Sequence, residues 1–137
     1  MAAAAACILL FHAGCRPAVE PGPEQQSNAG ATAEAGPVTV RFEWPDDRPT
    51  TTEVVENVPA GTTLETVLRD LPQPEMQITG GGQTALVQSI GGVEISGDRG
   101  WTFEINDNFA TRGVGSTRLT PPTTITWRYT SFEEASQ

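Results

Sequence analysis

The stretch VTVRFEW, residues 38–44, decides the fold, because apolar and polar side chains alternate along it without a break. Val38, Val40, Phe42 and Trp44 share one face of an extended chain, and the polar residues between them share the other. Alternation with a period of two residues predicts a β-strand with one face in the core and one toward solvent.

The segments that follow this strand predict a hairpin. Residues 45–49 (PDDRP) form a cluster of turn-favouring residues. Thr50 to Val58 is rich in β-branched residues and predicts the returning strand. Pro59, Ala60 and Gly61 then break that strand, so the second strand ends at Val58.

A short helix is predicted next. Thr62 and Glu65 have the spacing of a capping box, with Thr62 as the N-cap residue. Pro72 ends the helix after roughly ten residues, so it needs a sheet to pack on. The apolar stripe that would make this contact consists of Leu64, Val67, Leu68 and Leu71.

Three more strands are expected beyond the helix, at residues 85–90, 101–105 and 123–130, each rich in apolar or β-branched residues. Gly80 to Gly82 lacks the spacing and the Lys of a phosphate-binding loop, so we expect a flexible turn. Asn106, Asp107 and Asn108 predict a tight turn, and they lack the longer acidic repeat of a calcium loop.

This order of elements predicts an α+β fold, a β-grasp-like mixed sheet of about five strands with one crossing helix. In that arrangement the last strand lies beside the first. We expect one folded domain over residues 37–132, followed by a polar tail over residues 133–137, and a monomer.

The composition restricts the function. The formal net charge is -9 and every basic residue is Arg, so the chain repels phosphate backbones and nucleic acid is not an expected partner. His12, Cys7 and Cys15 all precede Arg16. Beyond them we expect no disulfide, no metal site, no cofactor, no catalytic residue and no enzymatic activity.

The N-terminus predicts export. Residues 1–14 (MAAAAACILLFHAG) form a short apolar run that ends in small residues, which is the pattern of a signal peptide. The run before Cys15 resembles a bacterial lipoprotein box, which implies lipidation of Cys15. Residues 15–36 are rich in Pro, Gly, Ala and Glu and predict a disordered tether. Secretion without a lipid, or an N-terminal structural helix, are the alternatives.

Four pieces of the folded part resemble a bacterial domain family of unknown function that is similar to the C-terminal domain of transcobalamin. They are residues 87–93 (VQSIGGV), residues 100–106 (GWTFEIN), the GVG of residues 113–115 before Leu119, and residues 125–129 (ITWRY). Two turns depart from the family pattern, Asp107-Asn108 and Pro121 to Thr123.

The resemblance implies a β-grasp-like fold and a binding role. In transcobalamin the equivalent domain covers one face of cobalamin, while a separate helical domain supplies the other face and the His that coordinates cobalt. This chain contains no such helical domain and no His beyond His12. Tight cobalamin binding by this chain alone is therefore not expected.

Two groups of residues are candidates for ligand binding. Trp101 and Trp127 form a stacking platform in one interpretation, although each lies on the apolar face of its strand, which favours core packing. The loop over residues 109–119 contains Arg112 and Arg118. In one interpretation, their guanidinium groups and the backbone N–H groups of the loop bind an anion or a carboxylate of a partner. The other interpretation, a flexible loop whose arginines offset nearby acids, is favoured. The candidate ligand-binding residues are Trp101, Asn106, Arg112, Gly113, Gly115 and Trp127.

These observations together predict a non-catalytic binding module of the bacterial cell envelope. It would face the periplasm or the cell surface, attached to a membrane through Cys15. Its partner would be a small ligand or an envelope protein. The alternatives are a structural or protein-interaction domain of the envelope, and an accessory component of cobalamin or cofactor uptake.

Overall fold

The computed structural model describes residues 34–136. The predicted signal peptide, Cys15 and most of the predicted tether lie outside these residues. The described part forms two sheets and one α-helix, an α+β arrangement in which strands predominate. Among the described residues, no helix is long and apolar enough to cross a membrane.

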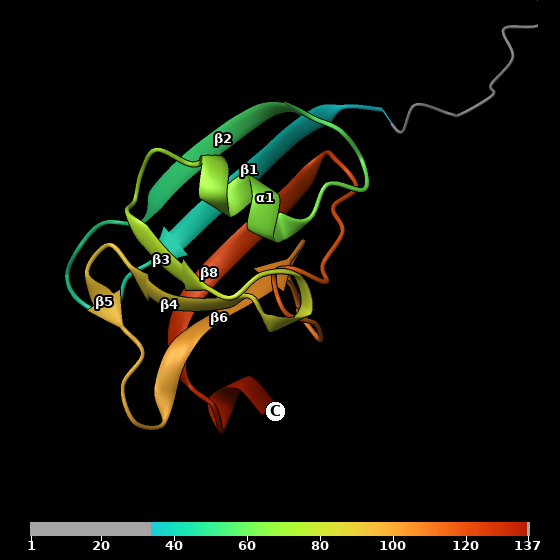
Figure 1. Cartoon of the computed structure of the whole chain (residues 1–137). Coiled ribbons are helices and arrows are strands. Elements are labelled where there is room, and N and C mark those ends of the chain that lie inside the picture. Colours follow the sequence, from blue (N-terminus) through green and yellow to red (C-terminus); the bar gives the residue numbers. More distant parts are fainter. Residues whose placement is uncertain (1–33, 137) are drawn as a thin grey trace, which may run out of the picture.

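The larger sheet has five strands in the order β2-β1-β8-β6-β7, as Figure 1 shows for its four longer strands. β1 and β8 are parallel, and Phe42 lies opposite Trp127 in their register. The other neighbouring pairs are antiparallel, so the sheet is mixed and the last strand lies beside the first, as predicted. The strands are β1 (Gly36–Glu43), β2 (Thr51–Val58), β6 (Arg99–Ile105), β7 (Asn108–Phe109) and β8 (Thr123–Ser131).

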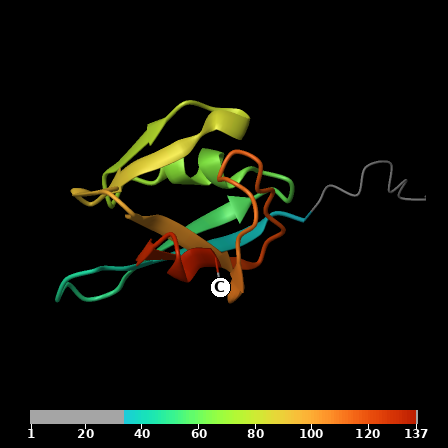
Figure 2. The ribbon, with the colours of Figure 1, turned by 90° about the horizontal axis from the view of Figure 1, so that it is seen from below.

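A second sheet of three strands was not predicted. It consists of β3 (Met76–Thr79), β4 (Leu86–Ile90) and β5 (Val93–Glu94), in the order β3-β4-β5. The sequence pattern identified β4 but placed it in a single sheet. Its backbone groups instead pair with β3 and β5, and its buried side chains pack onto the larger sheet. In Figure 2 the small sheet and the helix lie on the same side of the larger sheet.

The helix α1 (Leu64–Asp70) begins one residue later than predicted. Thr63, not Thr62, is the N-cap, and its Oγ1 accepts a hydrogen bond from the backbone N–H of Thr66 at 3.3 Å. The hydroxyl of Thr62 is used in the preceding turn, where it donates to the carbonyl oxygen of Pro59 at 2.7 Å. Glu65 therefore does not complete a capping box and is available for contacts across the fold.

The core lies between the larger sheet and the layer formed by α1 and the small sheet. Trp101 and Trp127 are 8% and 1% exposed, so both pack in the core, as the alternation along their strands favoured. Trp44 is half-buried, and the guanidinium of Arg48 lies 4.1 Å from the centroid of its ring. Two short 3-10 helices complete the fold, η1 (Gly82–Thr84) and η2 (Glu134–Ser136), the second within the predicted polar tail.

Candidate functional site

A surface hollow of about 480 Å³ lies beside the loop that joins β7 to β8. Nine residues from the end of β6, from β7 and from the loop line it, and two of them are arginines. The turn before β7 shapes one side of the hollow, because Asn106 and Asp107 both have positive φ and reverse the chain within two residues. The lining residues are Ile105, Asn108, Phe109, Ala110, Thr111, Arg112, Ser116, Thr117 and Arg118.

The loop is fixed in place by α1. The first backbone N–H groups of a helix have no partner within the helix. Here the N–H of Leu64 donates to the carbonyl of Thr117 at 2.9 Å, and that of Glu65 donates to the carbonyl of Val114 at 3.1 Å. Leu119 exchanges two further backbone hydrogen bonds with residues 61 and 62. The prediction of a flexible loop is therefore wrong, because the helix start and the loop satisfy each other's backbone groups.

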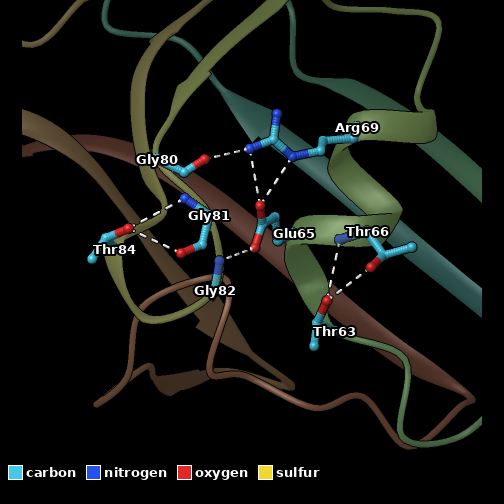
Figure 3. Close-up of polar contacts among 8 residues, drawn as sticks. All are labelled: Thr63, Glu65, Thr66, Arg69, Gly80, Gly81, Gly82 and Thr84. Carbon is cyan, nitrogen blue, oxygen red and sulfur yellow. Dashed lines mark hydrogen bonds and ion pairs between the residues drawn. The ribbon is translucent and has the colours of Figure 1, made fainter.

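A polar clamp on α1, formed by Glu65 and Arg69, holds a second loop at Gly80 and Gly82, as Figure 3 shows. Glu65 accepts a hydrogen bond from the backbone N–H of Gly82 at 2.9 Å and pairs with Arg69 at 2.9 Å. Arg69 also donates to the carbonyl of Gly80 at 2.9 Å. The hydrogen bond from Arg69, and then that from Gly82, hold the pKa of the Glu65 carboxyl below its usual value. The glycine turn predicted to be flexible is thus tied to the helix.

The two loops meet at Gly115. A Cβ atom at this position would overlap the carbonyl group of Gly82 and lie 2.8 Å from Glu65 Oε2. Only a residue without a side chain permits this approach. Gly113, two residues earlier, has space, since its nearest neighbour would be the carbonyl oxygen of Ala85 at 3.9 Å. Of the two glycines named as candidate site residues, Gly115 therefore has a clear structural role.

The guanidinium groups of Arg112 and Arg118 have no carboxylate partner among residues 34–136, although both line the hollow. Arg118 donates to the carbonyl oxygen of Gly61 at 2.9 Å, and the side chain of Arg112 makes no hydrogen bond within the described residues. Neither arginine forms an ion pair within the described residues, and the favoured interpretation, that these arginines offset nearby acids, stays a prediction.

The remaining candidate residues are distributed around the same loop. Asn106 ties the β6–β7 turn to β8, since its Oδ1 accepts a hydrogen bond from the N–H of Thr124 at 2.9 Å. Trp101, Gly113 and Trp127 line a separate, smaller crevice on another side of the loop. Of the six candidates, Arg112 lines the hollow, Trp101, Gly113 and Trp127 line the crevice, and Asn106 and Gly115 line neither.

Several residues of the hollow were not candidates. Asn108, Phe109 and Thr117 join it because β7 pairs with the end of β6 and the loop then folds back. The turn signal at residues 106–108 predicted a reversal of the chain there. It carried no information on the distance between β7 and residue 117.

Metal binding finds no support among the described residues. Within residues 34–136, no three His, Cys, Asp or Glu side chains gather where they could hold a metal ion. Glu43 and Glu104 lie on neighbouring parts of the larger sheet, but both bind Arg128, at 2.7 Å each. The cation that these carboxylates hold is therefore a guanidinium of the same chain.

Comparisons with known proteins give a family and a fold. The family model described as Domain of unknown function (DUF4430) matches residues 61–131, which include α1, the small sheet and the loop beside the hollow. The chain belongs to this family. No protein with a curated description matches it.

Among solved structures, the chain is similar to a protein from Ruminococcus gnavus ATCC 29149, described as a "putative metal binding protein". The two are 10% identical with a TM-score of 0.57, and the match covers 70% of this chain and 97% of the other. Similarity at this level of identity shows a shared fold and leaves the ligand open.

Proposed function

We propose that this protein is an exported, non-catalytic binding module that holds an anionic group, a carboxylate or a phosphate, between Arg112 and Arg118. The observation that carries the proposal is the pair of guanidinium groups without a carboxylate partner that line one hollow. In a chain with a formal net charge of -9, arginines that have no carboxylate partner within residues 34–136 are available to an external anion.

Guanidinium groups suit this role. They present planar pairs of N–H donors that match the oxygens of a carboxylate or a phosphate. The hydrogen bonds from α1 fix the backbone between Val114 and Leu119, so binding an anion does not have to order the loop. A prearranged loop loses less conformational entropy on binding.

The carboxyl groups support a non-catalytic role. A general acid near neutral pH needs a carboxyl with a raised pKa. Asp46, Glu65 and Glu134 instead have lowered pKa values, caused first by hydrogen bonds from Arg48, from Arg69 and from the backbone of Ser131 respectively. From Arg16 onward the sequence also holds no His, Cys or Lys that could take over proton transfer or nucleophilic attack.

The proposal includes export from the cytoplasm and attachment to a membrane through Cys15. Lipidation of Cys15 would hold the module at a membrane, facing the periplasm or the cell surface. Mass spectrometry of the mature N-terminus tests this: a diacyl or triacyl mass on Cys15 supports it, and an unmodified N-terminus overturns it.

The parallel central pair β1–β8 with one helix across the sheet supports the β-grasp assignment and the likeness to the transcobalamin C-terminal domain.

The description of the Ruminococcus gnavus protein raises metal binding as another function. Residues 34–136 do not fit it, because no three possible metal ligands gather there, and Glu43 and Glu104 both bind Arg128. We therefore do not extend metal binding to this chain.

Titration with succinate and, separately, with inorganic phosphate tests the anion site. We expect either probe to shift the NMR amide signals of residues 109–118, and the stronger of the two identifies the anion class. Arg112→Gln and Arg118→Gln should each weaken binding about tenfold, since each removes a charge-assisted hydrogen bond.

Arg41→Gln is the matched control, because it removes the same charge from an exposed position outside the hollow. It should leave the affinity within about twofold of the natural chain, as expected of a screened, distant charge. Equal weakening by all three variants would show diffuse attraction to net charge and would contradict the site. An absence of any shift with both anions would contradict it also.

A further inference from the structure

The hollow beside the β7–β8 loop also has an apolar part. Ile105, Phe109 and Ala110 line it, and they come from the edge of the larger sheet, where β7 pairs with the end of β6. Arg112 and Arg118 line the same hollow and belong to the loop that follows. One concave surface thus combines hydrophobic side chains from the sheet edge with cations from the loop.

Phe109 is the most exposed apolar side chain of the hollow, at 46%. Within residues 34–136, no aromatic ring and no guanidinium packs on its ring, whereas Trp44 and Tyr129 have both kinds of contact. Single exposed apolar residues are common on protein surfaces. Of the four exposed large hydrophobic side chains among the described residues, however, Phe109 alone lines the hollow that contains the two arginines.

The hydrogen-bond donors of the hollow suit a carboxylate better than a phosphate. Phosphate groups are typically held by several free backbone N–H groups. Here the N–H groups of Ala110, Ser116 and Thr117 all donate to carbonyl oxygens of the chain, at 3.0–3.1 Å. The Thr117 hydroxyl donates to the carbonyl of Gly113 at 3.0 Å. The charged donors that line the hollow are the two guanidinium groups, and a guanidinium pairs well with the two oxygens of a carboxylate.

The hollow has room for a ring as well as an acid group. Its volume of about 480 Å³ lies within the range of small-molecule pockets, roughly 300–1,000 Å³. A cavity of roughly 150 Å³ accommodates benzene, so an aromatic ring leaves space for a carboxylate and a short link. A small inorganic anion would leave the apolar lining in contact with water, which forgoes the hydrophobic contribution to binding.

We propose that the hollow binds a monocarboxylate that carries an aromatic ring, with the acid group at the arginines and the ring against Phe109. This assignment rests on the proposed function, since it narrows the ligand of the same anion site to one chemical class. Aromatic rings attract one another beyond the area they bury, which favours a ring over an aliphatic chain. A free aromatic acid and the C-terminus of a peptide that ends in an aromatic residue share this chemistry.

An NMR titration of the full-length chain with acetate, phenylacetate and phenylacetamide tests the proposal. Phenylacetate adds a ring to acetate, and phenylacetamide replaces the carboxylate of phenylacetate by a neutral amide of the same shape. We expect phenylacetate to bind about tenfold more tightly than either, because the ring and the charge each contribute. An intermolecular nuclear Overhauser effect should connect the ring protons of phenylacetate with those of Phe109.

Acetylphenylalanine distinguishes the two sources of the ligand, since it adds the amide of a peptide C-terminus to the same ring and acid. Binding tighter than that of phenylacetate would support the chemical class and identify a peptide C-terminus. Binding that is detectable but weaker than that of phenylacetate would support the class and identify a free acid.

Two variants separate the ring contact from the charge. Phe109→Ala should weaken phenylacetate about fivefold and leave acetate within about twofold, because it removes the ring contact and keeps both arginines. Retained acetate binding would show that the hollow is intact. Phe132→Ala is the matched control, since Phe132 is 51% exposed and does not line the hollow. It should leave both affinities within about twofold, as expected of a distant surface change.

Three outcomes would overturn the aromatic acid and leave the anion site in place, provided that succinate still shifts the signals of residues 109–118. The first is equal affinity for phenylacetate and acetate. The second is equal affinity for phenylacetamide and phenylacetate. The third is equal weakening of phenylacetate by Phe109→Ala and Phe132→Ala. If no anion shifts these signals, the anion site itself is contradicted, and the aromatic acid with it.

Discussion

Arg128 and the arginines of the loop show two different uses of the same side chain. Arg128 lies on the face of the larger sheet opposite the core, where Glu43 and Glu104 each bind it at 2.7 Å. The hydrogen bond that the Arg128 guanidinium donates to Glu43 raises the pKa of Arg128 further. Arg112 and Arg118 lie beside a hollow with no carboxylate partner in the described residues. Arg128, on a regular strand, thus pairs with neighbours in the sheet, whereas Arg112 and Arg118, on the loop, pair with no carboxylate of residues 34–136.

The largest effect on stability is expected from a substitution that displaces the loop carrying Arg112 and Arg118. Gly115→Ala would force its Cβ into the Gly82 carbonyl and toward Glu65, so the loop has to leave its position. We expect a loss of about 3 kcal/mol in the free energy of unfolding, typical of a severe overpacking, together with loss of anion binding. Urea denaturation followed by tryptophan fluorescence measures the first effect.

Gly113→Ala serves as the control for that experiment. Its Cβ would meet nothing closer than 3.9 Å, so stability should change by less than about 0.5 kcal/mol. If both variants lose the same stability, the loop is sensitive to any added side chain and the contact of Gly115 with Gly82 is not the cause.

Removal of the satisfied arginine should have a smaller cost. Arg128→Gln leaves Glu43 and Glu104 without their shared cation, and we expect a loss of about 1 kcal/mol because the Arg128 side chain is 43% exposed and partly screened by solvent. Chemical denaturation at low and at high salt measures it. The loss should shrink as salt is added, and a loss that does not depend on salt would argue for packing instead of charge.

The polar clamp on α1 gives a pH dependence. The pKa of Glu65 is lowered in the folded chain, so its stabilising contribution is complete above the pKa of the unfolded chain. It is lost as the pH falls through the folded-state value. The difference in unfolding free energy between the natural chain and Glu65→Gln should therefore narrow between about pH 6 and about pH 3.

Glu56→Gln makes the same change of charge at an exposed position of β2 that has no ion pair within residues 34–136. The pH dependence of its difference from the natural chain should be weaker than for Glu65→Gln. Equal curves for the two variants would mean that the pH effect reflects net charge and does not come from the clamp.

The smallest effect is expected at Arg112. Arg112→Gln should change the free energy of unfolding by less than about 0.5 kcal/mol, because the Arg112 guanidinium makes no hydrogen bond or ion pair within residues 34–136. Measured in the same denaturation series as Arg128→Gln, this result would show that Arg128 stabilises the sheet and that Arg112 does not stabilise the loop. A loss as large as that of Arg128→Gln would reveal a structural role for Arg112 and weaken the proposed anion site.

Local sequence patterns predicted the positions of the longer strands well, but they predicted the pairing of strands into sheets less well. The alternation at residues 38–44 and 123–130 identified β1 and β8 and the faces of Phe42 and Trp127, since period-two burial is a property of one strand alone. The second sheet escaped prediction because Met76–Thr79 and Val93–Glu94 are too short to show a pattern. The capping signal was wrong by one residue, because Thr62 and Thr63 are adjacent and equally suited to it.

The candidate site shows the same division between local and distant contacts. The sequence identified the loop over residues 109–119 and its two arginines, since a cation and glycines in an acidic chain are visible as residue types. It favoured a flexible loop, and that part of the prediction was wrong. The hydrogen bonds that fix the loop come from Leu64 and Glu65, about fifty residues away.

The sequence by itself determined the class of fold and the absence of His, Cys and Lys from Arg16 onward, because alternation, helix stops and residue types are properties of the chain as written. Only the tertiary structure decided which arginines pair with carboxylates of residues 34–136 and which do not. Those properties depend on which distant groups come within hydrogen-bond distance, and that distance is set by the packing of α1 and the small sheet onto the larger sheet.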